Sequence, residues 1–148
     1  MTLQIRPVTP ADHDAWLPLW QDYLVFYETV LPDEVTEAAW ERIFDPAEPV
    51  GCLGAFDDDE LVGFCHHLFH RSTWSLTWYC YLEDLYVAPE ARRAGAARAL
   101  IEATAELAVA AGSTKLYWQT HQTNARARSL YDQVAHHDGY LLYERELT

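Results

Sequence analysis

Aromatic and aliphatic residues recur every three or four positions early in the chain, which is the spacing of one face of a helix. The series consists of Trp16, Leu19 or Trp20, Tyr23 and the pair Phe26–Tyr27. Thr9 and Asp12 precede it, and both are suitable N-caps. Before them, Leu3–Arg6 predicts a short strand. A second, shorter helix is expected over Thr36–Phe44, capped by Thr36.

From Val50 onward the pattern changes to extended apolar runs that alternate with helical stretches. Two such runs, joined by the acidic sequence DDDE, predict a β-hairpin with a polar turn. The expected elements are strands at 50–56, 61–70, 76–87, 115–120 and 139–146, and helices at 92–111 and 124–134. The apolar stripe of the first of these helices is Ala96, Leu100, Ala103 and Leu107. Gly112 is a suitable residue just beyond its C-terminus.

The order of these elements is β-α-α-β-β-β-α-β-α-β, which predicts a mixed α/β domain around one sheet. The 148 residues are typical of a single domain, and no repeat or low-complexity linker divides them. We therefore expect one domain over residues 1–148. Half of the residues are apolar, enough for a sizeable core.

The chain is strongly acidic, with 23 Asp and Glu residues against 10 Lys and Arg and a formal net charge of −13. This balance argues against a nucleic-acid partner, because neutralising phosphates requires an excess of cations. An acidic surface would attract cationic small molecules or basic peptides. For the charge taken alone, solubility is the favoured explanation.

Three cysteines, Cys52, Cys65 and Cys80, lie in apolar or aromatic surroundings. An odd number in such surroundings indicates buried free thiols in a reducing compartment and not a disulfide framework. No apolar run reaches the length that spans a bilayer, and the N-terminal sequence lacks the pattern of a secretory signal. A cytoplasmic protein without a membrane partner is therefore expected.

The sequence RRAGAA at 92–97 combines two adjacent arginines with a glycine at the start of a predicted helix. A helix N-terminus presents unpaired N–H groups and a partial positive charge, so it can bind an anion. Gly95 would let a ligand oxygen approach the backbone, and Arg92 and Arg93 would add charge-assisted hydrogen bonds. An ordinary alanine-rich helix with two solvated arginines is an equally good explanation of this stretch alone.

Two motifs resemble the signatures of the GNAT family of N-acetyltransferases. The first, Arg/Gln-x-x-Gly-x-Gly/Ala, matches Arg92, Gly95 and Ala97 between a strand and a helix, as the family requires. The second, Asn-x-x-Ala-x-x-Leu-Tyr, is matched by Asn124, Ala127, Leu130 and Tyr131. The stretches FYE, YLEDLYV, LYWQT and YERE are similar to the histone and polyamine acetyltransferase branch, so the resemblance covers nearly the whole chain.

The resemblance implies the acyl-CoA N-acyltransferase fold, a mixed, mainly antiparallel twisted sheet with a central splay and about four flanking helices. It also implies that the bound anion is the pyrophosphate of acetyl-CoA. The residues implied for this cradle are Arg92, Arg93, Ala94, Gly95, Ala96 and Ala97. Family members usually have Gly where Arg93 stands and Val or Ile where Ala96 stands. Arg93 therefore either weakens close backbone approach or faces solvent.

The family also implies a place for the thioester, in the splay between the fourth and fifth strands. The backbone of Leu85, Tyr86 and Val87 would pair with the pantetheine and polarise the acetyl carbonyl, which is oxyanion-type stabilisation. Asn124 would bond the pantetheine or the strand, and Ala127 would be small because the cofactor passes close by. Tyr131 is implied as the acid that protonates the departing thiolate.

Glu83 maps onto the base proposed for the polyamine-acetylating relatives. A carboxylate is a plausible base because an alkylammonium, with a pKa of about 10.4, must lose a proton before attack. Glu83 could instead bind the positive charge of the substrate, and both roles remain open. Asp84 should point to the opposite face and make a structural hydrogen bond. Tyr81 stands where the histone-acetylating founder has its glutamate base, so that version of the mechanism does not transfer.

The acceptor site is expected beside the first helix, where relatives form its wall, with Tyr27 and Glu28 as substrate-binding residues. Trp74 and Trp78 could line this site or a dimer surface, and a homodimer is expected. The sequence HHLFH places His66 and His70 on one face of a strand, where either could border the acceptor pocket, although surface positions are favoured. No third ligand has a zinc-like spacing, so no metal is expected.

These observations predict an acetyl-CoA-dependent N-acetyltransferase acting on a primary amine of a polyamine, an amino acid or a lysine-bearing peptide. One alternative is a CoA-binding regulatory module that has lost catalysis, although retention of Glu83 and Tyr131 speaks against it. A small α/β domain that binds another nucleotide is a further alternative.

Overall fold

The computed structural model describes residues 2–148, which form two compact units that divide after Trp118. In chain order, the first unit consists of β1 (Leu3–Pro7), α1 (His13–Phe26), α2 (Asp33–Ile43), β2 (Val50–Asp57), β3 (Glu60–His70), β4 (Trp78–Val87), α3 (Ala96–Ala110) and β5 (Ser113–Tyr117). Short 3-10 turns at Pro10–Asp12 and Pro89–Ala94 lead into α1 and α3. The second unit contains α4 (Ala125–Val134).

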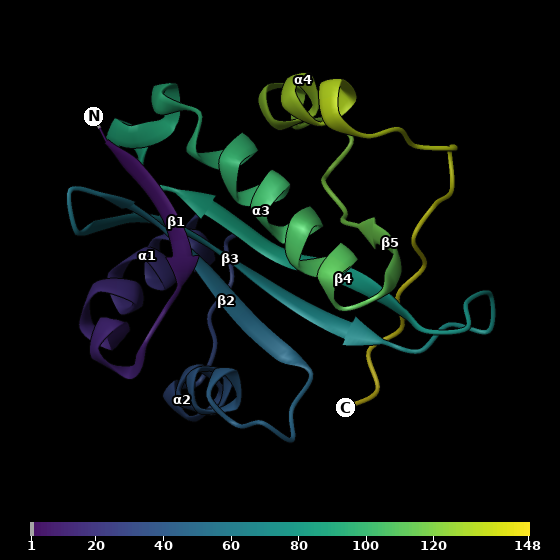
Figure 1. Ribbon diagram of the computed structural model, residues 1–148, viewed down its shortest axis with the longest axis horizontal. Helices are drawn as coiled ribbons and strands as arrows, with labels where there is room; N and C mark the ends of the chain where they lie inside the picture. The colour runs from purple at the N-terminus through teal and green to yellow at the C-terminus, as the bar shows by residue number, and fades with distance from the viewer. Residues whose placement is uncertain (1) are drawn as a thin grey trace. The chain divides into compact units, whose positions relative to one another are not determined.

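The five strands of the first unit form one sheet in the order β1-β2-β3-β4-β5 (Figure 1). The pairs from β1 to β4 are antiparallel, whereas β4 and β5 are parallel. The β2–β3 hairpin turns at Asp58 and Asp59, which both have positive φ, a conformation that Asp tolerates better than most residues. The expected hairpin and the mixed, mainly antiparallel sheet are both confirmed.

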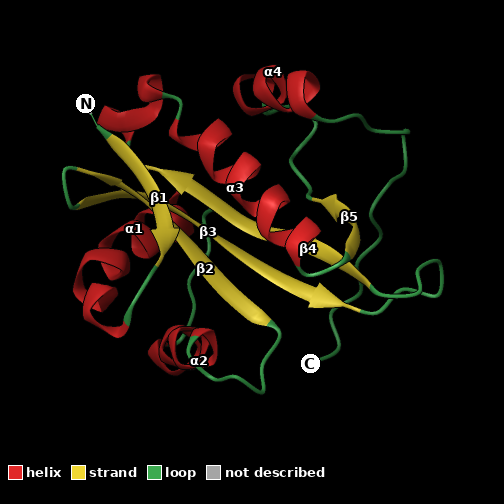
Figure 2. Cartoon of the chain, viewed as in Figure 1, coloured by secondary structure: helices red, strands yellow, loops and turns green. Residues whose placement is uncertain are grey.

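Helices cover both faces of this sheet (Figure 2). Side chains along β3 alternate between the two faces, as they must in an extended chain. Phe64 and His66 meet Trp20 of α1, while Cys65 on the other face lies 3.3 Å from the Thr104 hydroxyl of α3. The sheet is therefore the middle layer, with α1 and α2 on one side and α3 on the other.

Aromatic residues of α1 and α2 fill the layer between these helices and the sheet. Trp16 is fully buried, with its ring stacked on Trp20 at 5.9 Å and inclined to Trp40 at 4.7 Å. Ring pairs at these separations add stabilisation beyond the area they bury. The helical spacing that predicted α1 thus marks the face that the helix buries. Cys52, Cys65 and Cys80 are buried free thiols, as expected.

Two helix boundaries differ from the predictions. α2 begins at Asp33 and not at Thr36, which lies inside the helix and accepts a hydrogen bond from Trp20 Nε1 at 3.1 Å. Pro32 occupies the N-cap position, and the acidic residues Asp33 and Glu34 suit the positive end of the helix dipole. The start at Thr36 was wrong because the preceding acidic residues already favour a helix.

α3 begins at Ala96 and not at Arg92. The turn after Pro89 has 3-10 geometry, and Gly95 adopts a left-handed conformation with φ 79°, which interrupts the helical backbone. The buried positions of α3 are Ala96, Leu100, Ile101, Thr104 and Ala108, so the predicted stripe is correct at its start and then turns by one position. Gly112 follows the helix with positive φ, as predicted.

The strand expected at 139–146 does not form. Within residues 119–148 the only helix or strand is α4, and Tyr140, Leu141 and Tyr143 are exposed. A strand requires a partner for its N–H and C=O groups, and this unit supplies none. None of the helices in the described part of the chain has the length and apolarity to cross a bilayer.

Candidate active site

β4 and β5 pair only near their first residues and then separate. Their register runs from Trp78 opposite Ser113 to Tyr81 opposite Tyr117. From Leu82 to Val87, β4 has β3 on one side and no strand of the first unit on the other. The central splay that the motifs implied is therefore present in this unit.

A β-bulge at Glu83 marks the point where the splay opens. His66 pairs with Asp84 and His67 pairs with Leu82, so Glu83 is an extra residue without a partner in β3. Bulges bend a strand and re-aim side chains, and they are frequent next to active sites. The one carboxylate that the sequence singled out as a base thus lies at the bend of the strand.

The backbone beyond the bulge presents alternate amides to the open edge. Ala88 N–H donates to Val62 C=O at 2.8 Å, which directs Ala88 toward β3. Because N–H groups alternate along an antiparallel pair, Tyr86 also faces β3, while Leu85 and Val87 face the splay. Of the three residues implied for the thioester, Leu85 and Val87 therefore have amides directed to the open edge, and the Tyr86 amide is turned away.

The N-terminus of α3 follows the end of β4 and has no side-chain cap. Its first intrahelical bond is Ala99 N–H to Gly95 C=O at 3.0 Å, so the amides of Ala96 and Ala97 precede the helical ladder. The first turn contains no acidic residue. A Cβ atom built on Gly95 would meet nothing within 4 Å. Gly95 is exposed and Ala97 is half-buried, whereas Ala96 is buried, so the terminus is open around Gly95 and could admit an anionic group there.

The two arginines before this cradle differ in environment. Arg92 donates from Nε to Val87 C=O at 3.1 Å, and its guanidinium lies 5.8 Å from the centre of the Tyr86 ring. Arg93 is exposed. Arg92 therefore joins the end of β4 to the cradle and retains its terminal N–H groups for a ligand.

A buried chain of polar groups lies behind Glu83 on the α1 side of the sheet. Trp16 Nε1–H donates to His66 Nε2 at 3.1 Å. Since this nitrogen is the acceptor, the proton of His66 resides on Nδ1, which donates to Asp84 Oδ2 at 2.9 Å. The structural hydrogen bond expected for Asp84 is confirmed. His66 is 6% exposed, so the expectation of a surface position for it was wrong.

Tyr23 of α1 lies close enough to Asp84 to be affected by its charge. Burial and then the Asp84 charge raise the pKa of Tyr23 far above its usual value, and the same two causes raise the pKa of Tyr27. Partial burial, followed by the charge of Asp84, raises the pKa of Glu83, while His66 opposes the shift. These interactions place Tyr27 and Glu83 within the electrostatic field of one half-buried carboxylate, that of Asp84.

Glu28, the other substrate-binding residue expected from the sequence, follows the end of α1. It is exposed and has a φ of 53°, which is uncommon for Glu. No hydrogen bond or ion pair that the structure gives brings it to Asp84 or Glu83. The charge of Asp84 thus acts on Tyr27, and both Tyr27 and Glu28 remain expected substrate-binding residues.

The second unit carries the other motif. Asn124 is the N-cap of α4, where its Oδ1 accepts a hydrogen bond from Ala127 N–H at 3.3 Å. Ala127 and Tyr131 are both partly buried on this helix. The first and fourth residues of the Asn-x-x-Ala pattern therefore have a local structural purpose, since they close the first turn of the helix.

Nothing in the sequence indicated that Tyr23 lies beside Asp84, and for His66 a surface position was favoured over one beside the acceptor pocket. The available signal for His66 was its position within a strand of otherwise buried residues, because a histidine there requires buried partners. The signal for Tyr23 was weaker, since its helical spacing indicates only a core position. Within the described residues, no cluster of His, Cys, Asp and Glu could hold a metal ion.

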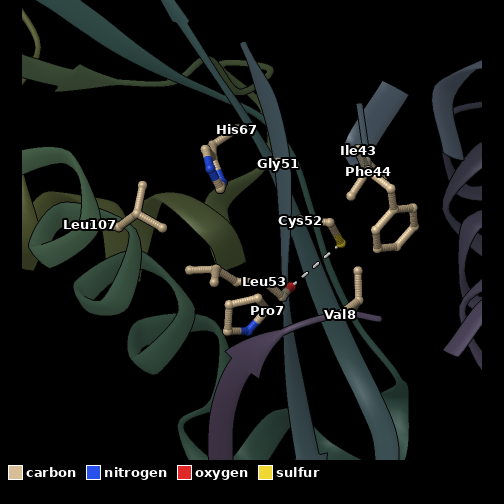
Figure 3. A pocket seen from close by; sticks show the side chains of 9 residues that line it. All are labelled: Pro7, Val8, Ile43, Phe44, Gly51, Cys52, Leu53, His67 and Leu107. Carbon is tan, nitrogen blue, oxygen red and sulfur yellow. Dashed lines mark hydrogen bonds between the residues drawn. The ribbon is translucent and has the colours of Figure 1, made fainter. Parts of the chain in front are cut away.

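A separate cavity of about 200 Å³ lies at the edge of the sheet where β1 ends. In Figure 3, His67 and Leu107 flank one side of β2, while Ile43 and Phe44 lie on the other side. Burial lowers the pKa of His67 to about 4, and its Nδ1 has no hydrogen-bond partner. The lining is otherwise apolar, so this cavity lacks the donors and acids of the site at the splay.

Comparison with known proteins decides the family to which this site belongs. The profile of the acetyltransferase (GNAT) family matches residues 14–136. This chain is a member of the GNAT family. The resemblance found in its two motifs is thereby confirmed.

Curated relatives of this GNAT chain are N-acetyltransferases. D-amino-acid N-acetyltransferase HPA3 of Saccharomyces cerevisiae is 36% identical over 95% of this chain and 89% of the relative. Thialysine N-epsilon-acetyltransferase of Caenorhabditis elegans is 40% identical over 88% of this chain and 81% of the relative. The GNAT chain is therefore an enzyme of the N-acetyltransferase class.

Solved structures agree with the fold of this GNAT chain. A probable acetyltransferase has a TM-score of 0.84 at 25% identity, over 100% of this chain and 99% of that chain. The aminoglycoside acetyltransferase AAC(6')-Iy, in complex with a bisubstrate analogue that contains CoA, has a TM-score of 0.85 at 18% identity over the whole of both chains. At that identity the likeness establishes the acyl-CoA N-acyltransferase fold and no more.

Proposed function

We propose that this GNAT enzyme transfers the acetyl group of acetyl-CoA to a primary amine by direct attack on the thioester. The observation that carries the proposal is the arrangement of one strand and one helix end. The edge of β4 that carries the Leu85 and Val87 amides leads directly into the uncapped N-terminus at Gly95. Such a pair of features can hold both ends of a long acyl carrier.

The uncapped terminus would hold the pyrophosphate. Its amides at Ala96 and Ala97 and the helix dipole favour a negative charge. Arg92 and Arg93 would add charge-assisted hydrogen bonds, and Ala94 leaves room beside them. When bound, acetyl-CoA supplies an acetyl group activated as a thioester.

The strand edge would hold the acetyl group. N–H donors at Leu85 and Val87 would stabilise the negative charge that develops on the acetyl oxygen, which is commonly the largest contribution in acyl transfer. Asn124 and Ala127 of α4 would complete the pantetheine site, as the family motif implies.

The proton of the amine would pass to Glu83, directly or through a water molecule. The amine nitrogen then forms a bond to the acetyl carbon, the carbon–sulfur bond breaks, and Tyr131 gives its hydroxyl proton to the departing thiolate. Its raised pKa makes Glu83 a stronger base than an ordinary surface glutamate, because a general base works best when its pKa lies near the operating pH. Asp84, held by its hydrogen bond with His66, would maintain that raised pKa.

The acceptor would be a small amine or a peptide amine near Tyr27 and Glu28. The named relatives act on D-amino acids and thialysine. A net charge of −13 favours the approach of a cationic acceptor and disfavours nucleic acid. The buried free thiols suit a cytoplasmic enzyme, and a homodimer is part of the proposal.

The test is a steady-state assay with acetyl-CoA against a panel of polyamines, amino acids and lysine peptides, together with calorimetry of CoA binding. Saturable CoA binding with acetylated product supports the proposal. Saturable binding with no product from any amine would assign the chain to a regulatory module. Thermal stabilisation by ATP or NAD but not by CoA would assign it to another nucleotide.

A further inference from the structure

A second hollow, of about 360 Å³, lies beyond the active site on the sheet face that carries His66. Its lining is made by His70, Arg71, Ser72, Tyr79, Lys115 and Tyr117. These residues come from the end of β3, the loop after it, the start of β4 and β5. All of them belong to the first unit, and none carries a carboxylate.

The hollow holds two cations that no acidic side chain neutralises. Among the described residues, neither Arg71 nor Lys115 forms an ion pair. The Arg71 guanidinium lies 3.7 Å above the Trp78 ring, and Lys115 Nζ lies 4.7 Å from the centre of the Tyr79 ring. In a chain with 23 acidic and 10 basic residues, two unpaired cations in one hollow are unexpected.

Aromatic contacts also fix these cations in position. A ring face attracts a cation but leaves its charge uncompensated, so the hollow remains electropositive. Arg71 is further held by its hydrogen bond from Nη1 to Thr77 C=O at 3.1 Å, and its other N–H groups stay available. Cations that are already ordered lose little side-chain entropy when an anion binds.

The polar wall of the hollow is ordered as well. His70 Nδ1–H donates to Arg71 C=O at 2.8 Å, and this leaves Nε2 to accept the hydroxyl proton of Tyr117 at 2.7 Å. The Ser72 hydroxyl oxygen accepts from Trp74 N–H at 3.0 Å, so its own proton is directed elsewhere. The hollow therefore combines two fixed cations with a hydroxyl donor, a donor set that matches a carboxylate.

An aromatic surface connects this hollow to the active site. Tyr117 lies between Tyr79, at 6.3 Å, and Tyr81, on which it stacks at 4.8 Å. The pairs His70–Tyr79 and His66–Asp84 are rows of the same face, separated by four residues of β3. At about 3.3 Å per residue this separation is about 13 Å. An extended peptide of about four residues has that length.

We propose that the hollow is a subsite for the carboxylate of the acceptor, and that the acceptors include short peptides acetylated at their N-terminal amine. The peptide would lie along Tyr81 and Tyr117, with its amine at Glu83 and its carboxylate at Lys115 and Arg71. This inference rests on the proposed acetyl transfer for the position of the amine.

The experiment compares tetraglycine with tetraglycinamide, which have the same length and amine but differ in the terminal charge. With the wild-type enzyme and acetyl-CoA we expect KM for tetraglycine to be at least tenfold lower, with kcat within twofold. Glycine and glycinamide should differ by less than twofold, because they are too short to reach both ends. Equal KM values for the two tetrapeptides would overturn the proposal.

Lys115→Met should remove the tenfold difference. Arg42→Met is the matched control, because Arg42 is an exposed residue of α2 and its loss changes the net charge by the same amount. The control should keep the difference, and loss in both variants would reduce the effect to overall charge. Lys115→Met should also elute from a sizing column as the wild type does. An altered oligomeric state would place the cations in an interface and overturn the subsite.

Binding of N-acetyl-tetraglycine separates this inference from the proposed function, because this probe has a carboxylate but no amine to acetylate. Calorimetry should detect it with the wild type and not with Lys115→Met. If no amine is acetylated yet the probe binds, the proposed function fails and the anion site stands. If amines are acetylated and the probe does not bind, the subsite fails alone.

Discussion

Replacing His66 by leucine removes the central group of the buried polar chain. The Trp16 Nε1–H then lacks an acceptor, and Asp84 loses its imidazole donor. An unsatisfied buried donor costs about 1–3 kcal/mol, and a hydrogen bond to a charged group contributes about 1.5–3 kcal/mol. The added apolar volume of leucine offsets part of this loss. We expect the free energy of unfolding to fall by about 3–4 kcal/mol.

The assay is urea denaturation followed by tryptophan fluorescence, since Trp16 and Trp20 are buried next to His66. With a slope of about 2 kcal/mol per molar urea, the midpoint should decrease by about 1.5–2 M. His66→Gln is the matched control, because its amide oxygen can accept from Trp16 and its amide N–H can donate to Asp84. We expect it to recover most of the loss. If glutamine and leucine reduce stability equally, the hydrogen-bond chain does not carry the effect and the reasoning is refuted.

Four further changes test other parts of the structure. Glu83→Gln should lower kcat by at least 100-fold and remove the acid limb of the kcat/KM profile, and an unchanged profile would leave Glu83 only a binding role. Because the folded pKa of Glu83 is raised, its ionised form opposes folding above that pKa, so the same variant should have a higher Tm than wild type at pH 7 and an equal Tm at pH 3. Tyr131→Phe should lower kcat much more than acetyl-CoA affinity, and equal losses would contradict its role as an acid. Gly95→Glu should abolish acetyl-CoA binding in calorimetry. Gly95→Ala has the same backbone strain at φ 79° and should still bind acetyl-CoA. Equal loss of binding in both variants would attribute the effect to backbone strain and not to the added carboxylate. Burial lowers the pKa of His67 from 6.5 in the unfolded chain to about 4 in the folded protein. The free energy of unfolding should therefore be at its full value above pH 6.5 and should decline by about 3 kcal/mol as the pH falls to 4. The variant His67→Phe should not show this decline.

The fold was predictable from the sequence wherever one periodicity persisted. The alternation from Val50 to Val87 predicted the hairpin and the long third strand, and Gly112 marked the end of α3. The spacing of apolar residues and the glycines that end helices are local features of the sequence, and the structure follows them closely. The errors lie where a competing local signal acts, as at Pro32 before α2 and at Gly95 before α3.

The site was predictable only in part because much of it depends on pairing between strands. Family motifs pointed to Gly95 and Glu83, but no motif contained the bulge, which follows from the register of β3 against β4. His66 and Tyr23 are distant from Asp84 in the sequence, and their contacts with it exist only after α1 packs on the sheet. The predicted final strand failed for the same reason, since alternation alone does not supply a partner.

The extra residue Glu83 does not change the faces of the sheet to which its neighbours Leu82 and Asp84 point. Leu82 faces α3 and Asp84 faces α1, as consecutive strand residues would do if nothing stood between them. Glu83, which we propose as the base, is therefore inserted into β4 as a bulge, and its side chain does not contribute to the packing of the sheet. A lineage could exchange this side chain for another and keep the hydrophobic interior intact. Chemistry at this place could change while the architecture stays constant.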